Sequence, residues 1–207
     1  MTIDEQTQKE QAYKNLVALQ NDPDSGVFIG VRSVIHSIRN SGGTMPHEEG
    51  LTKLMNIAGQ MAEVVNRHSA CKNKCSMCCN MAVHMTFGEA AIIGSKIGVE
   101  PVKDHTVKTA VELLKDIIAS EKAIDKYSGV PCPFNGPDGC TIYEHRPIAC
   151  RTCFNMTDDP RLCDVSTSQS VNRFNAAPIW DAQAFICYTH NDRSGDIREF
   201  FPKGKTK

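Results

Sequence analysis

Apolar residues recur at helical spacing through much of the first third of the chain. The clearest stripe, with apolar positions three or four residues apart, predicts one apolar helix face made of Leu51, Leu54, Met55, Ala58, Met61, Ala62 and Val65. Two earlier helices are expected over residues 3–20, ended by the Asn-Asp-Pro-Asp of residues 21–24, and over residues 26–38. A stripe of this kind packs into a protein core more often than it binds a partner.

Further helices are expected downstream. Thr86 is followed three residues later by Glu89, the pattern of a capping box at a helix start, and Gly98 suits the end of that helix. Apolar positions at 107, 110, 111, 114, 117 and 118 predict an amphipathic helix over residues 107–118. A last helix is expected over residues 182–188, followed by a loose tail beyond Asp192.

Residues 129–160 have a different character, because proline and glycine recur there. A loop-dominated segment of this length is not expected to fold on hydrophobic burial alone, and a bound metal would hold it in place. The predicted fold class is therefore mostly α, with a helical body and an irregular cysteine-rich metal-binding lobe. We expect a helical N-terminal region (residues 1–70), a cysteine-cluster domain (71–163), and a C-terminal helix and tail packed on the same body (164–207).

Cysteine is the anomaly of the composition, with ten residues in a chain of 207. The net charge of −1 gives no electrostatic footprint for nucleic acid, and no apolar run is long enough to predict a membrane span. The polar start of the chain has no secretory pattern, so the expected compartment is the cytoplasm. Clustered cysteines in reducing cytosol bind metal or do redox chemistry more often than they form disulfides, although a disulfide framework stays an alternative.

Two segments, 71–79 and 132–153, carry the cysteines that we predict as metal ligands: Cys71, Cys75, Cys78, Cys79, Cys132, Cys140, Cys150 and Cys153. The pairs 75/78 and 150/153 have the Cys-x2-Cys spacing with which a tight turn directs two sulfurs at one ion. The adjacent residues Cys78 and Cys79 point in different directions, which favours two thiolate sites, or a cluster plus a single ion. Zinc and iron, the latter as an ion or in a 4Fe-4S cluster, both suit sulfur ligands, and the sequence does not choose between them.

Other residues near the cysteines have two interpretations each. Lys72, Lys74 and Arg151 either lower thiol pKa values or are ordinary surface cations. His84 and His145 are either ligands or neighbours of ligands, or residues with only local hydrogen bonds. Cys163 and Cys187 lie outside the pattern.

The first three cysteines also match the spacing of the radical-SAM cluster, Cys71-x3-Cys75-x2-Cys78. That motif lies after the first strand of a partial βα barrel. Helical patterns surround it here and no βα units follow, so this interpretation is disfavoured.

Two blocks resemble a known family. The first is Cys71…Cys75…Cys78-Cys79 with Thr86…Glu89 after it, and the second runs from Pro131-Cys132-Pro133-Phe134 through Gly139-Cys140 to Tyr143-Glu144-His145-Arg146-Pro147 and Cys150-Arg151. Over about residues 71–155 the chain is similar to the YkgJ-type cysteine-cluster family, bacterial proteins described as zinc- or iron-chelating domains. The resemblance implies seven ligands, Cys71, Cys75, Cys78, Cys79, Cys132, Cys140 and Cys150, while Cys153 depends on its Cys-x2-Cys spacing.

The resemblance leaves the activity open. Flagellin lysine N-methylase is a distant relative of the family and is thought to combine an iron–sulfur cluster with S-adenosylmethionine. No catalytic constellation is visible here apart from the cysteines, and Gly42-Gly43 lies in a turn between helices rather than in a nucleotide-binding loop. We therefore expect metal binding, with two alternatives: a cluster-dependent protein-modifying enzyme such as a SAM-using lysine N-methyltransferase, or a metal-stabilised interaction module whose N-terminal helices bind a protein.

Overall fold

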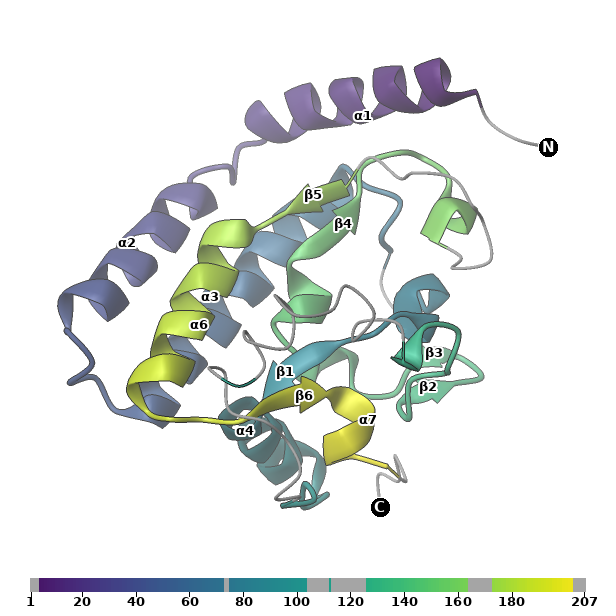
Figure 1. Ribbon diagram of the computed structural model, residues 1–207. Coiled ribbons are helices and arrows are strands. Elements are labelled where there is room, and N and C mark those ends of the chain that lie inside the picture. The colour runs from purple at the N-terminus through teal and green to yellow at the C-terminus, as the bar shows by residue number, and fades with distance from the viewer. Residues whose placement is uncertain (1–3, 73–74, 104–111, 113–125, 164–172, 203–207) are drawn as a thin grey trace.

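The computed structural model describes residues 4–72, 75–103, 112, 126–163 and 173–202. Three helices fill its N-terminal part: α1 (Glu5–Gln20), α2 (Val27–Asn40) and α3 (His47–Arg67). Their positions confirm the helices predicted from the apolar pattern. Helix α1 lies across one end of the molecule, while α2 runs beside α3 and α6 (Figure 1).

The apolar stripe of α3 forms the centre of the core. Leu51, Leu54 and Val65 have no exposed surface, and α3 packs against α2, α4 and α6. Burial of such side chains is the main favourable contribution to folding. The stripe is therefore a core face and is closed to partners, whereas Tyr13 on α1 and Ile29 on α2 are exposed.

Helix α4 (Phe87–Ile97) begins as the sequence predicts. The Thr86 side chain accepts a hydrogen bond from the Glu89 backbone, and the Glu89 carboxyl accepts one from the Thr86 backbone, which completes the capping box. Gly98 ends the helix at φ +70°, a conformation that favours glycine. Helix α6 (Ala177–Thr189) is longer than the predicted 182–188, because Pro178 suits its first turn.

A short antiparallel sheet joins β1 (His84–Thr86) to β6 (Ser194–Asp196), and α7 (Ile197–Phe200) follows at once. Phe200 is 1% exposed and belongs to the core. The prediction of a loose tail beyond Asp192 is therefore wrong for the residues described up to 202. The partner strand lies far back in the chain, so no local pattern predicted this packing.

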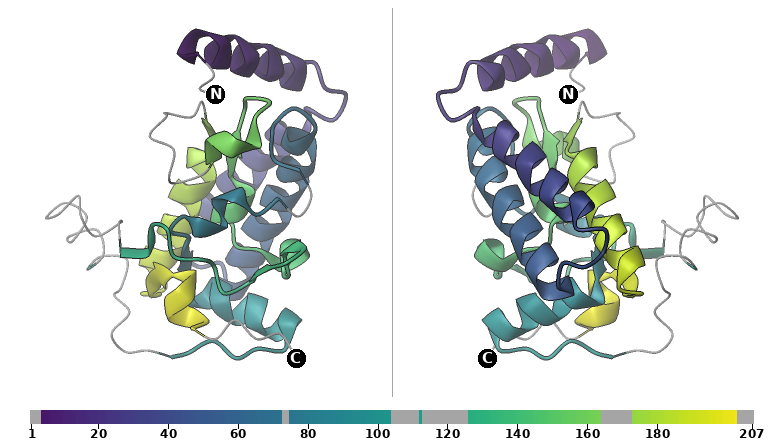
Figure 2. Two further views of the ribbon diagram at one scale, coloured as in Figure 1. Left: turned by 90° about the vertical axis from the view of Figure 1, so that its right-hand side faces the viewer. Right: turned by 90° about the vertical axis from the view of Figure 1, so that its left-hand side faces the viewer.

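The irregular lobe contains only short elements. Its strands are β2 (Asn135–Gly136), β3 (Gly139–Cys140), β4 (Cys153–Asn155) and β5 (Arg173–Asn175), paired β2–β3 and β4–β5. Its 3-10 helices in the described chain are η1 (Met77–Asn80), η3 (Tyr143–His145), η4 (Ala149–Arg151) and η5 (Pro160–Cys163). Figure 2 shows these pieces on one side of the layer formed by α2, α3 and α6. The arrangement confirms a mostly α fold with an irregular cysteine-rich region.

The described residues do not test two of the sequence predictions. The amphipathic helix expected over residues 107–118 falls almost entirely outside the described residues, and the three-part division of the chain stays a prediction. In the part of the chain that the structure describes, no helix has both the length and the apolar character needed to cross a membrane.

Candidate metal centre

A cavity of about 390 Å³ lies where the helical layer meets the irregular lobe. Its walls come from the end of α3, from α6, and from the cysteine-bearing segments of the lobe. Phe154 and Trp180 contribute to a largely apolar lining. The cysteines on its wall, which we call the cavity group, are Cys71, Cys75, Cys78, Cys150, Cys153 and Cys163.

Backbone hydrogen bonds bring the segment after α3 against strand β4. The Ala70 amide donates to the Asn155 carbonyl (2.9 Å), and the Asn155 amide donates to the Cys71 sulfur (3.4 Å). The Cys75 amide donates to the Lys72 carbonyl (2.9 Å). The two ends of the cavity group, 71–78 and 150–153, are therefore joined although they are distant in sequence.

A second set of thiols, Cys79, Cys132 and Cys140, lies beside the cavity group, and we call it the clasp group. The Cys132 amide donates to the Cys79 carbonyl (2.7 Å), which ties the two cysteine segments together directly. Cys140 pairs with Asn135 in the β2–β3 hairpin, and the Asn135 amide returns to the Cys132 carbonyl (3.0 Å). The thiol of Cys79 interacts electrostatically with those of Cys132 and Cys140.

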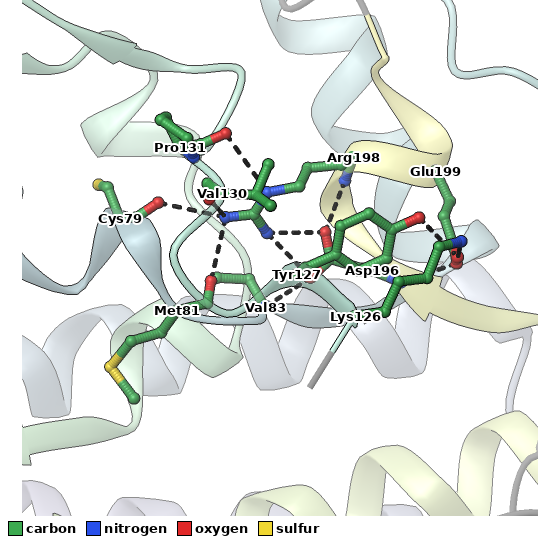
Figure 3. Close-up of polar contacts among 10 residues, drawn as sticks. All are labelled: Cys79, Met81, Val83, Lys126, Tyr127, Val130, Pro131, Asp196, Arg198 and Glu199. Atoms are coloured by element: carbon green, nitrogen blue, oxygen red, sulfur yellow. Dashed lines mark hydrogen bonds and ion pairs between the residues drawn. The ribbon is translucent and has the colours of Figure 1, made fainter. Parts of the chain in front are cut away.

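Arg198 of α7 holds the backbone around the clasp group (Figure 3). Its guanidinium donates to four carbonyls, those of Cys79 (3.2 Å), Met81 (3.2 Å), Pro131 (3.3 Å) and Val130. It also pairs with the Asp196 carboxylate at 2.8 Å, and the Tyr127 ring lies 5.5 Å away. Because Arg198 is only 8% exposed, these contacts satisfy its charge inside the protein. A residue near the C-terminus thus fixes both cysteine segments.

The adjacent residues Cys78 and Cys79 fall in different groups. Besides its sequence neighbour, Cys78 interacts electrostatically with cavity-group thiols, whereas Cys79 interacts with the clasp group and with Cys75. Cys150 lies between the groups, since its thiol interacts with Cys78 on one side and with Cys132 on the other. The two groups are therefore adjoining rather than remote.

The protein raises the pKa of most of these thiols. Burial, reinforced by neighbouring thiolates, raises the pKa of Cys78 and of Cys79 to about 12. Burial also raises the pKa of Cys71, Cys132, Cys140 and Cys150. These thiols are neutral near pH 7 in the metal-free protein, so a bound ion must displace their protons.

The donor set fits a sulfur-loving metal. Clustered cysteines are the ligands that zinc and iron–sulfur centres use. Among the described residues, however, no three His, Cys, Asp or Glu side chains lie close enough together to hold one ion. Metal binding would therefore require the thiols of each group to move toward one another.

Two arginines supply positive charge beside the thiols. Arg146 stacks 3.9 Å from the Tyr143 ring and opposes the rise in the pKa of Cys140 and Cys150. Arg151 is half-buried and donates to the Arg146 carbonyl (2.8 Å), so it is not a plain surface cation.

The other candidate side chains differ in whether they line the cavity. Lys72 is exposed and lines the cavity, as does His84, whereas Lys74 lies outside the described residues. His145 is not among the residues that line the cavity.

Two residues of this region were missed by the sequence analysis. Cys163 lines the cavity but has no spacing partner in the sequence. Arg198 acts on backbone carbonyls, which leave no trace in the side-chain pattern. The capping-box pair Asp196 and Glu199, which marks the start of α7, was the one available signal.

The comparisons with known proteins bear on the same region. No curated protein and no solved structure matches the chain. Residues 70–170, which contain all of the predicted ligands, match the CxxCxxCC family model, described as a putative zinc- or iron-chelating domain. The cysteine-bearing region of this chain is therefore similar to that cysteine-cluster family.

Proposed function

We propose that the protein binds zinc or iron through two adjoining sets of thiolates. The ligands in this proposal are Cys71, Cys75, Cys78, Cys150 and Cys153 of the cavity group, and Cys79, Cys132 and Cys140 of the clasp group. The observation that carries it is the separation of Cys78 and Cys79 into different groups of thiols. One tetrahedral ion takes four ligands, and eight thiols in two groups exceed that number.

Charge supports the same proposal. Thiolates around a divalent ion carry excess negative charge, and the guanidinium groups of Arg146 and Arg198 lie beside them. A bound zinc ion would supply structural cross-linking of the lobe, whereas iron in a 4Fe-4S cluster would also supply electron transfer. The chain's own contribution is to hold the thiols on two walls and to neutralise their charge.

Anaerobic purification, followed by metal analysis and an absorption spectrum, tests the proposal. Broad visible absorption with iron and sulfide supports a cluster, and stoichiometric zinc without colour supports zinc. A chain that folds without metal and gains no thiolate-bound metal on reconstitution would falsify the proposal. The control is a protein with Cys187, which lies outside both groups, replaced by serine.

A second candidate is favoured by the cavity itself. An enzyme that uses a metal centre needs space for a substrate next to the metal, and a cavity of about 390 Å³ is large enough for a small molecule. The distant relation to flagellin lysine N-methylase that the sequence resemblance implies makes S-adenosylmethionine the first ligand to test. Calorimetric titration of the metal-loaded protein with S-adenosylmethionine should show saturable binding. An absence of binding heat at millimolar concentration contradicts this candidate.

A further inference from the structure

Cys163 is a buried cysteine on the same wall as the predicted ligands. It ends η5 and is 7% exposed. Helix η5 packs against η1, the element that carries Cys78, and the two thiols are close enough to interact electrostatically. Its position therefore combines burial, access to the cavity and proximity to another thiol.

The loop before η5 is folded by one buried side chain. Asn155, which is 1% exposed, donates from Nδ2 to the Asp159 carbonyl (2.9 Å) and accepts at Oδ1 from the Thr157 amide (3.0 Å) and hydroxyl (2.8 Å). The backbone amide of the same Asn155 donates to the sulfur of Cys71. One residue thus connects a predicted ligand with the turn that leads the chain to Cys163.

Cys187 shows that burial alone does not produce this arrangement. It is 2% exposed on α6, yet it is not among the residues that line the cavity. Its main electrostatic neighbours are the carboxyl groups of Asp192 and Glu89, and no thiol is among them. The two cysteines outside the predicted ligand set are therefore different in kind.

We infer that Cys163 is a metal ligand of the cavity group. This inference rests on the proposed function and extends it, because Cys163 lies within the matched residues 70–170 but outside the cysteine spacing from which the ligands were predicted. Cys163 raises the number of cavity-group ligands from five to six, both more than the four that one tetrahedral ion uses, so the group takes more than one zinc or iron ion with shared sulfurs. Each thiol that binds gives its proton to solvent, and no oxidant or reductant is needed.

Cobalt(II) titration of the reduced, metal-free full-length chain tests the inference, since each cobalt–thiolate bond adds to the charge-transfer absorption. The Cys163→Ser variant should lose part of this absorption and bind the remaining cobalt roughly tenfold or more weakly, at least the effect of losing a residue that only supports a ligand. The Cys187→Ser variant should match the wild type. If Cys163→Ser matches it as well, the inference is overturned while the proposed function stands. A wild type without any cobalt–thiolate absorption overturns both.

A second measurement avoids substitution, in case Cys163→Ser fails to fold. Thiol alkylation of the wild type is mapped by mass spectrometry with zinc bound and after chelation. Zinc should protect Cys163 and leave the labelling of Cys187 unchanged. Equal labelling of Cys163 in both states would overturn the inference.

Discussion

The cavity group and the clasp group use the same ligand chemistry but are built differently. Cavity-group thiols come from several elements and share an open, apolar space of about 390 Å³. Clasp-group thiols come from two segments whose backbones are hydrogen-bonded to each other and to Arg198. Backbone hydrogen bonds also join the cavity-group segments, but only the clasp-group segments are held in addition by Arg198 before metal arrives, while the cavity group has room for a ligand or several ions.

Because of this difference, two cysteines that are adjacent in sequence should contribute differently to metal binding. Cys78 and Cys79 are adjacent in sequence, yet the first lines the cavity and the backbone carbonyl of the second accepts a hydrogen bond from the Arg198 guanidinium (Figure 3). Where the backbone is already fixed, less conformational entropy remains to be lost on metal binding. The clasp group should accordingly bind its ion with less reorganisation than the cavity group.

The largest effect on metal binding is expected when the two adjacent cysteines are replaced one at a time. Cys78→Ser should weaken metal binding at the cavity group, and Cys79→Ser at the clasp group, each by roughly a hundredfold or more, because loss of a ligand exceeds the cost of losing a supporting residue. Native mass spectrometry of each variant counts the ions that remain, and Cys187→Ser is the control. Loss of the same ions in both variants would show that the thiols form a single centre.

Arg198→Met should produce the next largest effect. It removes a buried charge, leaves the Asp196 carboxylate without its charged partner and frees four carbonyls, so the free energy of unfolding should fall by about 3–5 kcal/mol. Urea denaturation of the metal-free chain measures this. Metal loss should begin at the clasp group, with the cavity group less affected.

Arg39→Met is the matched control for that substitution. Arg39 is exposed and lies 4.0 Å from Asp181, so its removal should cost less than about 1 kcal/mol. Equal effects of the two substitutions would mean that Arg198 does not hold the clasp group.

The helices were predictable because their signals are local. The apolar spacing of α3 and the capping box of Thr86 and Glu89 each lie within one element, and the structure places both as expected. Strand β6 is different, because its ladder partner among the described residues, β1, is a distant segment. Three-residue strands carry too little pattern to predict such a pairing.

The candidate site was predictable in composition but not in grouping. Cysteine spacing located both segments, and the argument that adjacent side chains diverge anticipated two sets of thiols. The sequence did not predict which thiols share a wall, since this depends on contacts such as that between Asn155 and Cys71. The role of Arg198 was not predicted because four of its partners are backbone carbonyls, which leave no pattern in the sequence.

Glu89, which contacts the segment that carries Cys150, should make the free energy of unfolding depend on pH. This fully buried carboxyl accepts hydrogen bonds from the Ile148 amide, at the start of η4, and from Gln183. Burial raises its pKa from 4.5 to about 7, although those hydrogen bonds oppose the rise. Between about pH 4.5 and 7 the unfolded chain loses this proton and the folded chain keeps it. The free energy of unfolding should therefore fall by up to about 3 kcal/mol as pH rises through this window.

Urea denaturation of the metal-free chain from pH 4.5 to 8 checks this behaviour. The comparison of wild type with Glu89→Gln isolates the contribution, because the other carboxyl groups are the same in both proteins. Glu63→Gln, an exposed substitution on α3, is the control and should leave the pH profile unchanged. A wild-type profile parallel to that of Glu89→Gln would contradict the assignment.

The smallest effect is expected on the apolar side of the cavity. The Thr152 hydroxyl is buried, donates to the Ile148 carbonyl (2.8 Å) and accepts from the Trp180 indole (2.6 Å). Thr152→Val keeps the shape of the side chain and removes both hydrogen bonds, so the free energy of unfolding should fall by about 1 kcal/mol. Because neither residue offers a metal ligand, the number of bound ions should stay the same in both groups. Trp180 is the sole tryptophan, and its fluorescence follows the unfolding directly. A loss of metal from Thr152→Val would mean that the apolar wall, and not the thiols alone, determines what the cavity group binds.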